Sequence, residues 1–198
     1  MSGQQMEVRL FDKGAAQYAD TDGTPYLTDK FRDAVVDGDS EVYPMRYDAY
    51  QDEMQFKKDG KILLLDKTID HEILFLDDST RFMSITLDGG ARGFAEVLWS
   101  KEEQKAALLK HYQIGYSPET MGNGYSGSKP ARFGEPRSGL FFRTTKDYTL
   151  IKVPNGRKKI FQEIFGKDLR KEAKSYDLDP VKEGDLIKLL DIFYEYES

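Results

Sequence analysis

Side chains that could carry covalent or acid–base chemistry are scarce in this chain. It has no cysteine, which excludes thiolate catalysis, disulfides and cysteine metal sites, and it has two histidines. These are His71, at the expected start of a strand, and His111, near the end of an expected helix. A catalytic triad needs a nucleophile, a base and an orienting acid, and a histidine zinc site needs several imidazoles. We therefore predict no catalytic residue, no bound metal and no cofactor.

Three further patterns fall short of a known site. A glycine-rich stretch ends in Gly127-Ser128-Lys129, whereas a phosphate loop places its lysine directly after the glycine. The acidic turns at 20–23 and 37–41 do not fit the twelve-residue calcium loop, and aspartates in turns usually accept from nearby backbone N–H groups. The chain has 35 Asp and Glu residues, so a hydrolase that uses carboxylates alone stays open as an alternative.

The best local candidate for a ligand site is the stretch 116–137. Aromatic rings, amides and guanidinium groups suit a stacking surface for sugars or other small ligands. The simpler interpretation, which we favour, is that the rings fold back and pin the stretch. The candidate ligand-binding residues are Tyr116, Asn123, Tyr125, Lys129, Arg132, Phe133 and Arg137.

A second polar cluster surrounds Arg46, Tyr47 and Tyr50. It has the composition of a recognition patch. The alternative, which we prefer, is structural: Arg46 pairs with an acid across a turn while the tyrosines pack on a sheet.

These candidates are expected to lie on a β-rich framework. Met54 and Phe56 alternate with Gln55 and Lys57, which predicts a strand with the first two in the core and the other two facing water. Asp59-Gly60 follows, a strong hairpin signal. Turn residues separate the expected strands, which are 6–11, 34–36, 41–45, 53–57, 62–65, 72–76, 81–87, 94–99, 140–144 and 148–153. This spacing is typical of an antiparallel meander, sandwich or partial barrel.

Three helices complete the expected fold, which is α+β with a predominantly antiparallel sheet. Ser100 and Glu103 form a capping box that predicts a mid-chain helix over 101–112. Two C-terminal helices follow, with apolar faces formed by Ile160, Phe161, Ile164 and Phe165 and by Leu186, Ile187, Leu190 and Phe193. We expect a single domain over 1–198. It comprises a main β-rich part over 12–112, a long loop over 113–138, and a hairpin plus helices over 139–196.

Charge narrows the classes of partner. Residues 1–100 hold 11 Lys and Arg against 20 Asp and Glu, a net charge of −9, while residues 101–198 hold 18 against 15, a net +3. Wrapping a nucleic acid requires a basic face, so no nucleic-acid partner is expected. No apolar run approaches the length of a membrane span.

The two ends of the chain carry a resemblance. Gly23-Thr24-Pro25-Tyr26-Leu27 and the run from Met45 to Lys61 are similar to "GSPYL" and "RYNxYxDExEFKKDGK" elements in a group of uncharacterised exported proteins of Bacteroidetes-type bacteria. The run from Lys182 to Tyr194 is similar to their terminal "KxEEDLIKLLxYYN" helix. The resemblance implies export to the periplasm or cell envelope and no particular activity. The polar start at Met1 to Gln5 lacks a signal peptide and fits a mature protein whose signal was removed.

The expected function is that of a non-enzymatic cell-envelope protein with a structural or binding role, whose partner is an unknown protein or a glycan. One alternative is a glycan- or small-ligand-binding module that uses the stretch 116–137. The other is the carboxylate hydrolase.

Overall fold

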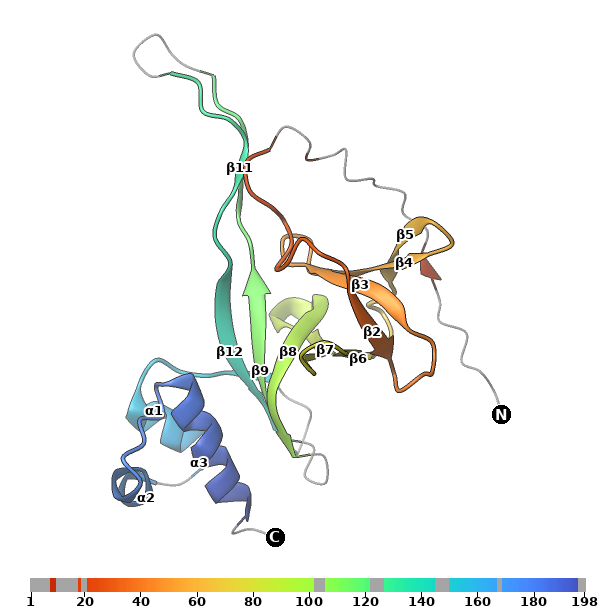
Figure 1. The fold of residues 1–198 in the computed structure, drawn as a ribbon. Coiled ribbons are helices and arrows are strands. Elements are labelled where there is room, and N and C mark those ends of the chain that lie inside the picture. The colour runs from red at the N-terminus through yellow and green to blue at the C-terminus, as the bar shows by residue number, and fades with distance from the viewer. Residues whose placement is uncertain are drawn as a thin grey trace. The chain divides into compact units, whose positions relative to one another are not determined.

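A computed structural model describes residues 8–9, 18, 21–101, 106–121, 127–144, 150–166 and 169–195. Within them, eleven strands form one sheet in the order β1-β5-β4-β3-β2-β6-β7-β8-β9-β12-β13 (Figure 1). Their bounds are β1 Val8–Arg9, β2 Arg32–Val36, β3 Tyr43–Asp48, β4 Glu53–Lys58, β5 Lys61–Leu65, β6 Glu72–Phe75, β7 Arg81–Thr86, β8 Arg92–Lys101, β9 Ala106–Gln113, β12 Arg137–Arg143 and β13 Leu150–Lys152.

The predicted fold class is confirmed. The ladders from β1 to β8 are antiparallel, as is the hairpin of β12 and β13. The strand order begins at β1 and ends at β13 without returning on itself, so the described sheet is open rather than a closed barrel. Three helices follow in the described chain: α1 Arg157–Glu163, α2 Arg170–Ser175 and α3 Glu183–Glu195. None of them is long and apolar enough to cross a bilayer.

The prediction of a helix over 101–112 is wrong. The end of β8 and the strand β9 occupy the described part of this range. Ala106, Ala107, Leu108 and Leu109 are all 0–1% exposed, so four consecutive side chains are buried. A surface helix buries one stripe, whereas a strand covered on both faces buries every residue. Burial on both faces therefore outweighs the capping pattern at Ser100 and Glu103.

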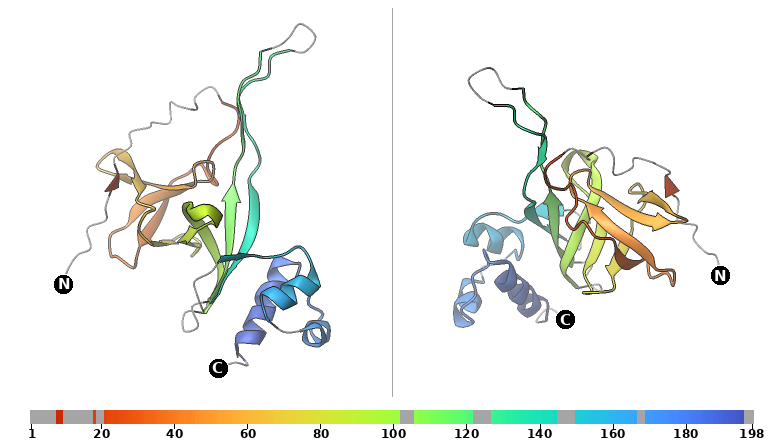
Figure 2. Two further views of the ribbon diagram at one scale, coloured as in Figure 1. Left: turned by 180° about the vertical axis from the view of Figure 1, so that it is seen from behind. Right: turned by 45° about the horizontal axis from the view of Figure 1, so that its top comes forward.

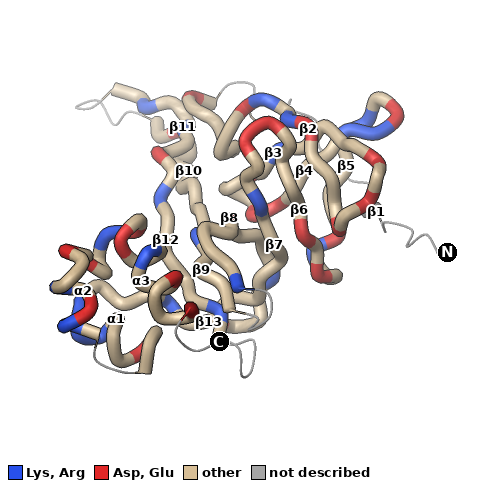
Figure 3. The backbone as a smooth tube through the Cα atoms, turned by 60° about the horizontal axis from the view of Figure 1, so that its bottom comes forward, with Lys and Arg blue, Asp and Glu red and all other residues tan. Residues whose placement is uncertain are grey.

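The described chain divides into two compact units. The first comprises residues 1–96 and 111–138, and the second residues 97–110 and 139–198. Whether the whole chain acts as a single domain stays a prediction. Lys and Arg are interspersed with Asp and Glu along the backbone (Figure 3).

The core of the first unit lies on the strands β2 to β8. Met54 and Phe56 are fully buried, as predicted. Lys57 is exposed, but Gln55 is 9% exposed and counts among the buried residues, so its predicted solvent-facing position is wrong. Its amide Oε1 accepts a hydrogen bond from Arg46 Nε at 3.0 Å. The polar face of this strand is therefore covered by a neighbouring side chain rather than by water.

The predicted loop over 113–138 is partly a β-ribbon. β10 Tyr116–Ser117 and β11 Arg132–Phe133 pair antiparallel, and Thr120 bridges Lys129 farther along. The ribbon leaves from the ends of β9 and β12 (Figures 1 and 2). This stretch lacks apolar alternation because most of its side chains are exposed, so its pairing had no signal in the pattern.

The second unit contains the C-terminal helices, which lie together in the views of Figure 2. The predicted apolar faces are buried except at Ile187, which is half-buried. They form one cluster with Trp99, Leu108 and Phe142 from the strands. Gly166, with a φ of +65°, lies three residues after the end of α1. The helix α2 was not predicted, and the segment between the strands expected over 140–144 and 148–153 lies outside the described residues.

Candidate functional site

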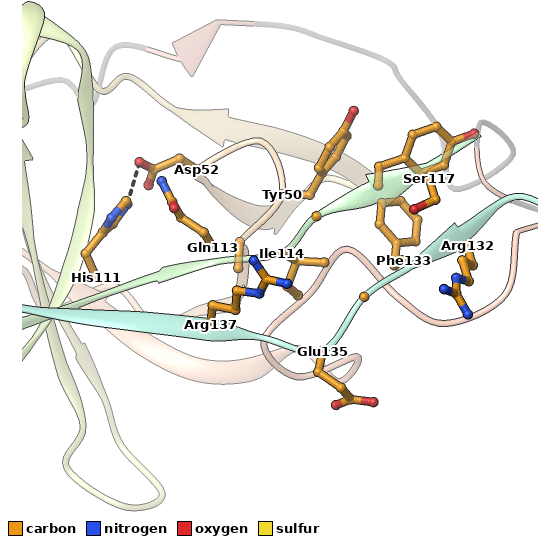
Figure 4. A pocket seen from close by; sticks show the side chains of 14 residues that line it. Tyr50, Asp52, His111, Gln113, Ile114, Ser117, Arg132, Phe133, Glu135 and Arg137 are labelled. Carbon is orange, nitrogen blue, oxygen red and sulfur yellow. Dashed lines mark hydrogen bonds and ion pairs between the residues drawn. The ribbon is translucent and has the colours of Figure 1, made fainter.

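A pocket of about 790 Å³ lies in the first unit. Three segments that are distant in sequence line it (Figure 4). They are the turn between β3 and β4, the end of β9 with the start of the ribbon, and the return from β11 into β12. The lining residues are Ala49, Tyr50, Asp52, His111, Gln113, Ile114, Gly115, Tyr116, Ser117, Arg132, Phe133, Gly134, Glu135 and Arg137.

Asp48 holds the turn between β3 and β4 in shape. Its Oδ1 accepts hydrogen bonds from the backbone N–H groups of Tyr50 at 3.0 Å and Gln51 at 2.9 Å. On the pocket side, the carbonyl of Ala49 accepts from Ile114 N at 3.1 Å. Burial raises the pKa of the Asp48 carboxyl to about 6, although these backbone donors oppose the shift. The turn is thus fixed by a carboxylate that is buried beneath it.

Asp52 connects this turn to β8 and β9. Its carboxylate accepts hydrogen bonds from His111 Nε2 at 2.9 Å, Tyr47 Oη at 2.7 Å and Phe94 N at 2.9 Å. A Cβ atom on Gly93 would overlap this carboxylate, so only glycine fits beneath it. Burial alone would raise the pKa of Asp52, but the hydrogen bonds from His111, Phe94 and Tyr47 outweigh it and hold the pKa below its ordinary value.

The Asp52–His111 pair has the composition of an acid–base dyad, but its setting is structural. The imidazole is 4% exposed, and the carboxylate already accepts three hydrogen bonds. Burial, followed by the charge and hydrogen bond of Asp52, raises the pKa of the Tyr47 hydroxyl, so it remains a proton donor. A fully bonded carboxylate of this kind positions the pocket wall and keeps the turn beside β9.

Aromatic rings form one side of the pocket. Tyr50, Tyr116 and Phe133 lie 5.2–5.8 Å apart between ring centroids, and Tyr18 stacks edge-on against Phe133 at 5.0 Å. Phe133 is buried, whereas Tyr116 is 39% exposed. The rings therefore pin the ribbon to the turn, as the simpler interpretation expects, and Tyr116 still presents apolar surface to a ligand.

Polar side chains form the remaining boundary. Arg132, Arg137, Gln113 and Glu135 make no side-chain hydrogen bond or ion pair within the part of the chain that the structure describes. Arg137 and Ile114 line the same pocket (Figure 4). Donors and acceptors are thus available at the pocket without an internal partner to displace.

The structure brings together most of the predicted site residues. Tyr116, Arg132, Phe133 and Arg137 line the pocket, and so does Tyr50 from the second predicted cluster. Lys129 lines an adjoining hollow. Asn123 and Tyr125 lie outside the described residues.

Arg46 and Tyr47 do not line the pocket. The Arg46 guanidinium carbon lies 3.4 Å from the ring centroid of Tyr26 and 4.3 Å from that of Phe31, and Nη1 donates to the Asp29 carbonyl. Among the described residues Arg46 forms no salt bridge, so the predicted pairing with an acid is wrong: stacking on aromatic rings takes its place. Tyr47 packs in the sheet, as expected, and is 2% exposed.

Asp52, His111 and Gln113 are pocket residues that sequence reasoning missed. The helix expected over 101–112 placed His111 on a helix end, away from any turn. The four-residue apolar run from Ala106 was the available signal, because a run bounded by polar residues also fits a doubly buried strand. No signal in the sequence pairs Asp52 with His111.

Comparison of the chain with protein-family models, with curated proteins and with solved structures found no match. Function is therefore argued from the pocket.

Proposed function

We propose that this protein is a non-enzymatic binding module of the cell envelope and that its pocket holds a carbohydrate. The observation that carries the proposal is the exposed ring of Tyr116 beside uncommitted donors and acceptors in one hollow. The C–H face of a sugar ring is apolar and packs on an aromatic ring. Sugar hydroxyls both donate and accept hydrogen bonds, so they match a boundary that offers guanidinium, amide and carboxylate groups together.

The charge of the pocket favours a neutral ligand. Two arginines, Arg132 and Arg137, are balanced by the carboxylates of Asp52 and Glu135. A polyanion such as nucleic acid requires a net positive surface, which this pocket does not offer. The net charge of −9 on residues 1–100 also disfavours a polyanionic ligand.

Binding is favoured over hydrolysis because the Asp52 carboxylate accepts three hydrogen bonds that lower its pKa. Glycoside hydrolysis needs a general acid whose pKa is raised. The hydrogen bonds to Asp52 instead hold its pKa below the ordinary value. We expect bound glycan to be released uncut.

Location in the periplasm or cell envelope is part of the proposal and rests on the resemblance of the two chain ends to exported proteins. Detection of a cleaved signal peptide on the natural precursor tests it. A precursor retained in the cytoplasm would contradict it.

A glycan array tests the binding role. Wild-type protein is expected to bind one class of neutral saccharide, and Arg137→Ala and Tyr116→Ala are each expected to weaken that binding about tenfold or more. Within the described residues the Arg137 side chain makes no hydrogen bond or ion pair, so its substitution separates ligand recognition from folding. Tyr176→Ala is the matched control, since Tyr176 is an exposed tyrosine of the second unit. Absence of binding to every glycan, or equal binding by all variants, would contradict the proposal.

A further inference from the structure

A second hollow of about 410 Å³ lies along the ribbon. Asp22, Ser117, Pro118, Thr120, Lys129, Pro130 and Arg132 line it. Ser117 and Arg132 line both hollows, and these two residues face each other as one pair of the ribbon ladder. The two hollows therefore share this residue pair in their walls.

We propose that the two hollows form one binding track and that the ligand is a linear, neutral oligosaccharide rather than a single sugar. This inference rests on the carbohydrate-binding role proposed above. The successive pairs Tyr116–Phe133, Ser117–Arg132 and Thr120–Lys129 define the direction of the track. From Tyr116 to Thr120 the strand advances about 13 Å at the usual rise per residue, so the track extends well beyond the stacking ring.

The track is preformed over this length. Asp22 forms an isolated parallel bridge to Arg132 on β11: its N–H donates to the Ala131 carbonyl at 3.0 Å, and its carbonyl accepts from Phe133 N at 2.8 Å. Gly23 follows with a φ of +79°, and a Cβ there would lie 3.2 Å from the Phe133 carbonyl oxygen. Gly23 thus permits a close approach of backbones that fastens the ribbon. A wall that is ordered before binding reduces the entropic cost of association.

The chemistry of the second hollow complements that of the first. It offers hydroxyls from Ser117 and Thr120, a cation from Lys129 and an acceptor from Asp22, but no aromatic ring. Its function is therefore hydrogen bonding, whereas stacking belongs to Tyr116. The residues that line the two hollows together carry three basic side chains, Lys129, Arg132 and Arg137, and three carboxylates, Asp22, Asp52 and Glu135. This balance along the whole track selects a neutral, hydroxyl-rich chain over a polyanion.

The test is calorimetric titration with cello-, manno-, xylo- and chito-oligosaccharides of one to six units. Affinity for the chain type that binds is expected to rise about tenfold or more with length until both hollows are filled, and then to level off. Thr120→Ala combined with Lys129→Ala is expected to remove that gain while leaving the affinity for the shortest bound sugar unchanged. Arg137→Ala is expected to weaken short and long chains alike.

Lys61→Ala is the control, because Lys61 is exposed on β5 and lines neither hollow. Affinity that is independent of length, or a double variant that weakens short and long chains equally, would overturn the track and leave the pocket's role intact. If the protein binds no oligosaccharide in the titrations and no glycan on the array, both the track and the carbohydrate-binding role of the pocket are overturned. Preferential binding of acidic glycans or of nucleic acid, abolished by moderate salt, would overturn the neutral-ligand assignment.

Discussion

Substitution of Asp48 by asparagine tests how the pocket wall is held. The Asp48 carboxyl is 2% exposed, and burial raises its pKa from 3.8 to about 6. As the pH falls from 7 to 4, the folded protein therefore takes up a proton at Asp48 before the unfolded chain does. The stabilisation that Asp48 provides is complete below the pKa of this carboxyl in the unfolded chain. It is lost as the pH rises through the raised pKa of the folded protein. The difference between the unfolded and folded pKa values of Asp48 corresponds to a loss of about 3 kcal/mol in the free energy of unfolding at neutral pH.

Asparagine keeps an oxygen that accepts from the N–H groups of Tyr50 and Gln51 but carries no charge. We expect Asp48→Asn to raise the free energy of unfolding at pH 7 by about 1–3 kcal/mol, and this gain to vanish near pH 4. Urea unfolding followed by far-ultraviolet circular dichroism measures it, because Trp99 lies in the second unit and fluorescence would report there. Asp33→Asn, an exposed carboxyl on β2, is the control. A difference between variant and wild type that is constant from pH 4 to pH 7 would refute the reasoning.

Three further outcomes are expected. Phe56→Ala removes a fully buried ring and should lower the free energy of unfolding by about 3–5 kcal/mol; a loss below about 1 kcal/mol would contradict its place in the core. EDTA should leave the melting temperature unchanged, since no group of three or more metal-ligating side chains gathers in the described residues; a fall that calcium or zinc reverses would show a bound ion. Truncation after Val153 should produce aggregation, because the helices cover Trp99, Leu108 and Phe142. Sedimentation and thermal unfolding check it, and a soluble fragment that unfolds reversibly would show that the helices serve a partner instead.

The framework of the fold was accessible to sequence reasoning because local signals were consistent there. Alternation around Met54 and the Asp59-Gly60 turn both indicate the β4–β5 hairpin, which the structure contains. The error at 101–112 arose because a capping box is a local pattern, whereas the burial of β9 depends on residues that are distant in sequence, including those of the C-terminal helices. The buried position of Gln55 also depends on a contact outside its own strand, since Arg46 on the adjacent strand covers it.

The site was only half accessible for a similar reason. Tyr116, Phe133 and Arg137 were predicted from composition, because aromatic and guanidinium groups together suit a stacking surface for a ligand. Asp52 and His111 became neighbours through the pairing of the β3–β4 turn with the end of β9, and that pairing leaves no periodic trace. The fit of Gly93 beneath the Asp52 carboxylate is likewise visible only in three dimensions.

Backbone chemical-shift mapping of the wild-type protein with the bound oligosaccharide tests the central claim most directly. The account predicts that shifts gather at Tyr50, at Gln113 to Ser117 and at Arg132 to Arg137, and extend to Thr120 and Lys129 for the longer chains. Shifts that gather instead on the helices of the second unit, around Tyr176 and Ile192, or an absence of shifts at saturating sugar, would contradict it.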